Sequence, residues 1–193
     1  EKPEITFYPF FFFLDVFSNF YESSFEIDDR TYYTTEQYLF SQKAIYIGDL
    51  DTAEKIMRNR EARTCKQIGE RDVPWSGTVD TWREFATEKL RISNLAKYSQ
   101  NENLRRTLFA TYPKILVETN PSDTFWGIGL KKGDREVYDQ SKWRGKNQMG
   151  HLLTEIRNEL MKNPKMALVD RKRSLVSSPE TPTARKRTSV SSI

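Results

Sequence analysis

The most constraining feature of the sequence is a set of amphipathic segments that have the 3.6-residue period of an α-helix. In the clearest segment, residues 147–161, apolar side chains recur at helical spacing: Met149, Leu152, Leu153, Ile156 and Leu160. Two other segments follow capping boxes, in which a Thr hydroxyl and a Gln or Glu side chain satisfy backbone N–H groups. These boxes are Thr34 with Gln37 and Thr81 with Glu84. The pattern predicts a fold in which helices dominate.

Glycines and short strand-like runs complete the predicted elements. A helix over residues 35–47 is expected to end near Gly48, and one over 51–68 before Gly69, because glycine tolerates the left-handed conformation after a helix. Further helices are predicted over 81–98 and 103–111. Aromatic and β-branched runs at 5–8, 25–27 and 30–33, with Asp28-Asp29 as a turn, predict a small antiparallel sheet, and 114–119 a buried strand. The expected fold class is α+β, mainly α: a compact multihelical single domain with a small antiparallel β-sheet.

The positive charge of the chain is concentrated at one end. The 193 residues carry a formal charge of +4, but residues 162–193 hold eight basic and two acidic side chains, which leaves a net charge of −2 on residues 1–161. The terminal segment is also rich in Ser, Thr and Pro, a composition that buries too little apolar surface to offset its chain entropy. We therefore predict a domain at 1–161 and a disordered basic tail at 162–193.

The tail suggests partners of its own. Arg-Lys-Arg triplets precede Ser174 and Thr188, and prolines follow Ser178 and Thr181, so the tail suits basophilic and proline-directed kinases. The basic clusters also suit nuclear import or nonspecific contact with nucleic acid, which should then be lost when residues 162–193 are removed. A solvated terminus without a role is an equal alternative.

Cysteine, histidine and apolar content limit the compartment and the chemistry. The only cysteine, Cys65, cannot form an intramolecular disulfide, and the only histidine, His151, excludes a multi-histidine metal site. The most apolar run, 9–14, is too short for a membrane span of about 20 residues and lacks the flanks of a signal peptide. We expect an intracellular protein, cytoplasmic or nuclear, that uses no metal or cofactor and does not bind membranes.

Two polar residues on the first predicted helix are candidates for chemistry. Glu36 and Lys43 are seven residues apart, which is two helical turns, so both project from one face with Phe40 between them. A carboxylate and an amine on one face can meet one substrate. The alternative is a solvated helix face, since most Glu and Lys side chains are exposed.

Two glycine-containing segments pair polar groups with tryptophan. Residues 123–129 place Asp123 just before Trp126 and Gly127, where an aromatic face can stack a base and glycine lets the backbone approach a ligand. The alternative is a tight turn whose Trp126 fills the core.

The second of these segments, residues 143–147, offers the same choice for Trp143 and adds a phosphate site. Asn147 is a favourable N-cap, and the free N–H groups of a helix start attract phosphate, helped by Arg144 and Lys146.

The order of these motifs resembles the NADAR family (NAD- and ADP-ribose-associated), also called YbiA-like. The resemblance covers the chain to about residue 161 and rests on these segments: Phe17-Ser18-Asn19-Phe20-Tyr21, Phe25-Glu26-Ile27, Tyr33 to Tyr38, Gln42-Lys43-Ala44, Ile68-Gly69, Arg71, Trp82, Ala96-Lys97-Tyr98, Gln100-Asn101, Leu116-Val117-Glu118, Asp123 to Gly129, Trp143 to Asn147, Gly150, and Leu153 to Arg157.

This resemblance implies an N-glycosidase that breaks a bond between ribose C1′ and a base nitrogen. The most favoured reaction is removal of ADP-ribose from guanine-type conjugates, and the substrate would be an ADP-ribose-containing or other phosphoribosyl compound. The alternatives are hydrolysis of phosphorylated riboflavin-pathway intermediates and a non-catalytic module that binds ADP-ribose or NAD. The charge of the chain suggests a further hypothesis, a module that binds nucleic acid.

The resemblance also implies roles for individual residues. Glu36 and Asp123 would stabilise an oxocarbenium-like transition state and transfer protons. Lys43, if burial lowers its pKa, would attack the anomeric carbon and open the ring to a Schiff base. The predicted substrate-binding residues are Asn19, Phe20, Trp126, Gly127, Trp143, Arg144, Gly145 and Asn147.

Overall fold

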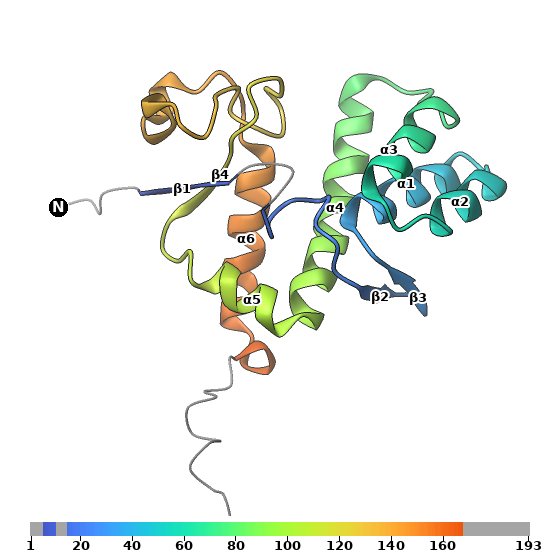
Figure 1. Ribbon diagram of the computed structural model, residues 1–193, viewed down its shortest axis with the longest axis horizontal. Coiled ribbons are helices and arrows are strands. Elements are labelled where there is room, and N and C mark those ends of the chain that lie inside the picture. The colour runs from blue at the N-terminus through green and yellow to red at the C-terminus, as the bar shows by residue number, and fades with distance from the viewer. Residues whose placement is uncertain (1–5, 11–14, 168–193) are drawn as a thin grey trace, which may run out of the picture.

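Helices make up most of the computed structural model, which describes residues 6–10 and 15–167 (Figure 1). The helices of this part are α1 (Thr35–Tyr46), α2 (Leu50–Met57), α3 (Ala62–Arg71), α4 (Val79–Gln100), α5 (Glu102–Phe109) and α6 (Gln148–Lys162). The strands are β1 (Phe7–Phe10), β2 (Phe25–Ile27), β3 (Arg30–Tyr32) and β4 (Ile115–Glu118), and short 3-10 helices lie at 135–138, 140–142 and 164–166. The mainly helical α+β class is confirmed.

Helix α4 divides the molecule. Helices α1, α2 and α3 lie on one side of it, and α6 with the β1–β4 pair lies on the other (Figure 1). Its fully buried Ala86, Leu90 and Tyr98 belong to the main hydrophobic core, which α1 joins through Leu39 and Phe40. A separate small core is formed by Val117 of β4 with Ile128, Leu130 and Val137 of the long connection from β4 to α6. The elements on the two sides of α4 therefore share one hydrophobic core along this helix.

The strands form two separate pairs. Strands β2 and β3 are antiparallel and are joined by Asp28 and Asp29 at φ 50° and 59°, which confirms the predicted hairpin. Strand β1 was expected in the same sheet, and this is wrong, because β1 pairs in parallel with β4, Phe7 opposite Ile115 and Phe10 opposite Glu118. A four-residue strand does not encode its partner locally, and the pairing depends on where α6 places β4.

The start of α1 confirms the Thr34 half of its predicted capping box, while the Gln37 side chain bonds the residue before the cap. The Thr34 hydroxyl accepts a hydrogen bond from Gln37 N at 3.0 Å, and the Gln37 side chain accepts one from Tyr33 N at 2.8 Å. The helix ends before Gly48, which has a φ of +86°. The cap matters for function because Glu36 lies in this first turn.

The single helix predicted over 51–68 is two helices. Helix α2 ends at Met57, and α3 begins after Glu61, whose carboxylate accepts from Arg63 N and Thr64 N. Gly69 therefore lies inside α3 rather than after its end. A Cβ on Gly69 would lie 2.2 Å from Phe40 Cδ1, so the glycine allows α3 to pack closely on α1.

The observed start of α4 and the end of the folded unit differ by a few residues from the predicted boundaries. Helix α4 starts earlier than predicted because the Thr78 hydroxyl, and not that of Thr81, caps it by accepting from Thr81 N at 3.2 Å. Residues 162–167, assigned to the tail, belong to the folded unit: α6 includes Lys162, and the carbonyl of Met166 accepts from Arg105 Nε at 3.2 Å. The rest of the predicted tail lies outside the described residues, and no helix within them is long and apolar enough to cross a membrane.

Candidate functional site

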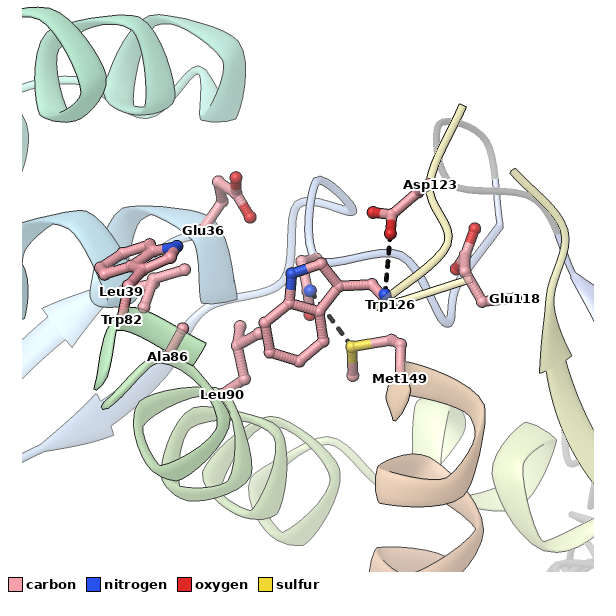
Figure 2. Close-up of a pocket in the computed structure, with 10 residues that line it drawn as sticks. Glu36, Leu39, Trp82, Ala86, Leu90, Glu118, Asp123, Trp126 and Met149 are labelled. Atoms are coloured by element: carbon pink, nitrogen blue, oxygen red, sulfur yellow. Dashed lines mark hydrogen bonds between the residues drawn. The ribbon is translucent and has the colours of Figure 1, made fainter. Parts of the chain in front are cut away.

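A cavity lies where α1, α4, the start of α6 and the connection after β4 meet (Figure 2). Its wall is largely apolar and aromatic, and several polar side chains also face it. The lining residues are Asn19, Glu36, Leu39, Trp82, Ala86, Leu90, Glu118, Asp123, Trp126 and Met149. Figure 2 shows Glu36 at one side, Asp123 and Glu118 at the other, and Trp126 between them. Four of the predicted site residues therefore line one cavity.

Helix α1 places Glu36 at the cavity. The side chain lies in the first turn, where Glu36 N donates to the carbonyl of Asn19 at 3.2 Å, and the residue is only 5% exposed. Burial raises the pKa of Glu36 to about 7, an effect that the charge of Lys66 partly offsets. Glu36 therefore changes its protonation near neutral pH, as a group that transfers protons should.

Lys43 lies two turns further along α1 and is also 5% exposed. Its Nζ donates to the carbonyl of Gly69 at 3.0 Å and lies 4.8 Å from the ring centre of Trp82. Burial lowers the pKa of Lys43, which favours the neutral amine. Lys43 is not among the lining residues, but Trp82, which it contacts, is. The alternative of a solvated helix face is wrong for both Glu36 and Lys43.

Asp123 shapes the opposite wall. Its Oδ1 accepts hydrogen bonds from Phe125 N at 2.9 Å and Trp126 N at 2.8 Å, so the carboxylate fixes the turn that carries Trp126. The Trp126 indole is half-buried in the cavity rather than fully enclosed in the core. This geometry is compatible with an aromatic wall beside a bound ring.

The cavity also contains a carboxyl group that the sequence analysis did not select. Glu118 ends β4, is 1% exposed and lines the cavity beside Asp123. Burial, together with the charges of Asp123 and Asp15, raises the pKa of Glu118 to about 8. A charged residue type at the end of a buried apolar strand was the available signal, since a carboxylate is seldom fully buried without a reason.

The predicted residues before α1 are near the site. Asn19 lines the cavity, but its side chain is committed to the protein: Oδ1 accepts from Thr35 Oγ1 at 2.8 Å and Asn94 Nδ2 at 3.2 Å, and Nδ2 donates to Met149 Sδ at 3.4 Å. Phe20 is half-buried, with Lys66 Nζ 6.0 Å from its ring centre. Asn19 thus supports the cavity wall and joins α1, α4 and α6.

The two glycine-containing segments lie against each other. Arg144 N donates to Ile128 O and Lys146 N to Thr124 O, both at 2.9 Å. A Cβ on Gly145 would lie 2.3 Å from the carbonyl oxygen of Gly127, and a Cβ on Gly127 would lie 3.0 Å from that of Glu118. Gly127 and Gly145 are therefore needed for close backbone packing, which holds Trp126 and Met149 at the cavity.

At the start of α6, two of the amides that the sequence analysis offers to a phosphate are used within the protein. The first two amides of the helix are already bonded, Gln148 N to Phe125 O at 3.1 Å and Met149 N to Trp126 O at 3.0 Å. Asn147 precedes the helix with a φ of 53° and makes no side-chain cap. Its side chain bonds β4 instead, accepting from Glu118 N and donating to Leu116 O, each at 2.9 Å.

The other two residues of this segment also lie outside the cavity lining. Trp143 donates from Nε1 to Val137 O at 3.0 Å and packs edge-on against Phe7, so it belongs to the small core. Arg144 is exposed. The core alternative is therefore correct for Trp143, while the role of Arg144 in binding phosphate stays a prediction.

Replacement of Asn147 by Ala is expected to lower the free energy of unfolding by about 2 to 4 kcal/mol, because it leaves a buried N–H and a buried carbonyl of β4 without partners. Denaturant unfolding measures the change. The exposed Asn103, replaced by Ala, is the matched control and should change the free energy by less than about 0.5 kcal/mol. Equal stability of the two variants would contradict the role given to Asn147.

Among the described residues, neither the cysteine nor a metal-binding cluster offers an alternative site. Cys65 is fully buried, and burial raises the pKa of its thiol to about 12, which makes it a poor nucleophile. Within the described ranges, no group of three or more His, Cys, Asp or Glu residues is placed to hold a metal ion. The cavity is therefore the best-supported candidate site.

Comparison with known proteins supports the family resemblance over most of the chain. The NADAR domain family model matches residues 12–161. Protein irg-1 of Caenorhabditis elegans is 35% identical over 159 residues, which is 75% of each chain. N-glycosidase YbiA of Escherichia coli is 31% identical over 145 residues, covering 75% of this chain and 80% of the relative.

Further similarities extend the set. An N-glycosidase of Acanthamoeba polyphaga mimivirus is 35% identical over 128 residues, 66% of this chain and 74% of the relative. A riboflavin biosynthesis protein of Vibrio vulnificus is 28% identical, but the chain spans only 37% of it. The NMR structure of E. coli YbiA superposes with a TM-score of 0.65 at 28% identity, covering 83% of this chain and 90% of that one.

Proposed function

Because the chain belongs to the NADAR domain family, we propose that it is an N-glycosidase that removes ADP-ribose from guanine-type conjugates. Relatives from a bacterium and a virus are named N-glycosidases and match most of the chain. The reaction breaks the bond between ribose C1′ and a base nitrogen and adds the elements of water.

The observation that carries the proposal is the set of carboxyl groups around one largely apolar cavity. Glu36 faces Asp123 and Glu118 across Trp126 (Figure 2), and burial raises the pKa of both Glu36 and Glu118. Cleavage of a glycosidic bond needs groups that stabilise positive charge at C1′ and others that protonate the leaving base. A cavity with carboxyl groups in different protonation states near pH 7 can supply both.

Lys43 supports a covalent route. Its Nζ would form a bond to C1′ while the C1′–N bond breaks, and the base would leave with the bonding electrons and a proton from a cavity carboxyl group. Loss of a proton from the amine and protonation of the ring oxygen then give an open-chain Schiff base. Water adds to its C=N carbon, releases ADP-ribose and restores the free amine. The lowered pKa of Lys43 favours the first step.

A second candidate function is cleavage of phosphorylated riboflavin-pathway intermediates. It is favoured by the similarity to the riboflavin biosynthesis protein, although the chain matches little more than a third of that protein. Such compounds share a ribosyl group and a phosphate with ADP-ribose conjugates, so the same cavity residues would act.

A panel of ribosyl conjugates, analysed by mass spectrometry, tests the proposal. We expect release of free ADP-ribose from guanine-linked ADP-ribose, little reaction with phosphorylated riboflavin intermediates, and none with Lys43→Ala. Preferred cleavage of the riboflavin intermediates would establish the second candidate. Saturable binding of ADP-ribose in calorimetry, without turnover of any conjugate, would instead show a binding module.

A further inference from the structure

Glu118 carries a buried carboxyl group that lacks a hydrogen-bond partner among the described residues. Neither Oε1 nor Oε2 has a hydrogen bond within the described part of the chain, although the residue is only 1% exposed. Buried polar side-chain atoms are normally paired, because an unpaired one costs the free energy of its lost hydration. The unpaired carboxyl group therefore does not stabilise the fold, and its presence calls for a role other than stability.

The backbone around Glu118 is, by contrast, fully bonded. Its N–H donates to Asn147 Oδ1 at 2.9 Å, and its carbonyl accepts from Ile128 N at 3.0 Å. Phe10 lies opposite it in the β1–β4 pair. The backbone of Glu118 is thus fixed by its N–H bond, its carbonyl bond and the strand pairing. Its carboxyl group lines the cavity without a hydrogen bond even though the segment is well anchored.

The surroundings of the carboxyl group favour its neutral form. Its charged neighbours are carboxylates, Asp123 in the following loop and Asp15, which pairs with Lys132 at 3.8 Å. Phe10 of β1 and Asn147, which precedes α6, are uncharged, and Glu36 of α1 lines the same cavity on its other side. Burial and these carboxylates raise the pKa of Glu118 to about 8, so at neutral pH the group holds a proton and can donate a hydrogen bond.

We propose that Glu118 contacts the substrate and donates a hydrogen bond to a ribosyl hydroxyl oxygen. A hydroxyl group fits this position because it accepts from Glu118 while it can donate to the adjacent Asp123, and ribose carries two hydroxyls on neighbouring carbons. The inference rests on the proposed function for its ligand class. It adds a substrate-contacting residue on β4 that also excludes ribosyl groups lacking the hydroxyl.

A ligand-binding experiment tests this contact without depending on turnover. Binding of ADP-ribose is measured by calorimetry from pH 6 to 9 for the wild-type protein, Glu118→Gln and Glu118→Leu. Gln is uncharged and still donates, so we expect it to bind ADP-ribose within about threefold of wild type at pH 6.5. Leu cannot donate and should weaken binding roughly tenfold to a hundredfold.

The pH dependence and two analogues make the test specific. The protonated form of Glu118 is complete well below its pKa of about 8 and is lost as pH rises through it, so wild-type affinity should fall above pH 8 while that of Glu118→Gln should not. Each of two analogues of ADP-ribose lacks one of the two neighbouring hydroxyls of the terminal ribose. One of these analogues should bind the wild-type protein more weakly than ADP-ribose does. The same analogue should bind Glu118→Leu as well as ADP-ribose does.

Three results would overturn the inference. They are no binding of ADP-ribose to the wild-type protein, equal affinity of wild type and Glu118→Leu when both are folded by circular dichroism, and weak binding by Glu118→Gln at pH 6.5. The last would show that the ionised carboxylate accepts a hydrogen bond from the ribosyl hydroxyl instead of donating one. Failure of the wild-type protein to cleave any conjugate, with these binding results intact, would refute the proposed function alone.

Discussion

Replacement of Lys43 by Arg is expected to lower the rate of ADP-ribose release by about 10³-fold or more. Arginine keeps the positive charge and can still donate a hydrogen bond to the carbonyl of Gly69, but it does not lose its proton and cannot act as a neutral nucleophile. Lys43→Ala should be equally inactive. The measurement is the single-turnover release of ADP-ribose from guanine-linked ADP-ribose.

Two controls separate chemistry from folding. The exposed Lys142, replaced by Ala, should keep the wild-type rate, and circular dichroism should show that Lys43→Arg is folded. Borohydride added during turnover should trap a ribosyl adduct on a peptide that contains Lys43. A nearly active Lys43→Arg variant, with no adduct trapped in the wild-type protein, would show that water attacks C1′ directly.

Replacement of Glu36 by Gln is expected to lower the rate of release by about 10²- to 10³-fold, a normal contribution for a group that transfers protons or stabilises charge in the transition state. The pKa of Glu36 is about 7, so its ionised form appears as pH rises through 7. The wild-type rate should therefore increase between about pH 6 and 8, and the contribution of Glu36 to this increase should be absent in Glu36→Gln.

The exposed Glu136, replaced by Gln, is the matched control and should leave the rate and its pH profile unchanged. Glu36 is buried, and burial disfavours its ionised form, so an uncharged Gln should not destabilise the fold, and unfolding experiments can verify this. A Glu36→Gln variant with the wild-type rate at every pH would remove Glu36 from the mechanism.

Much of the fold follows from residues that are close in the sequence. The cap of α1 by Thr34, the Asp28-Asp29 hairpin turn and the apolar stripe of α6 all depend on contacts within a few residues, and all are present. Two of the predictions that were wrong concern interactions over longer distances. Gly69 resembles a helix end but serves the packing of α3 on Phe40, and β1 finds its partner more than a hundred residues away.

The candidate site divides in the same way. Motif order selected Glu36, Lys43, Asp123 and Trp126, and the structure brings the first, third and fourth to one cavity with Lys43 against its Trp82 wall. The order of the motifs could not show that Trp143 packs against a separate core. A tryptophan in a short polar segment gives no sign in the sequence of whether it is exposed or buried.

The sequence by itself determined most of the helical elements, the basic end of the chain and the residue types that suit glycosidic chemistry, because these depend on local spacing and composition. Only the tertiary structure decided what Asn147 and Glu118 do. The Asn147 side chain bonds β4 instead of capping α6, and the Glu118 carboxyl group lines the cavity with no hydrogen bond to the described part of the chain. Both outcomes arise because residues from distant parts of the chain compete for the same hydrogen bonds, and that competition is settled only when β4, α6 and the connection between them pack together.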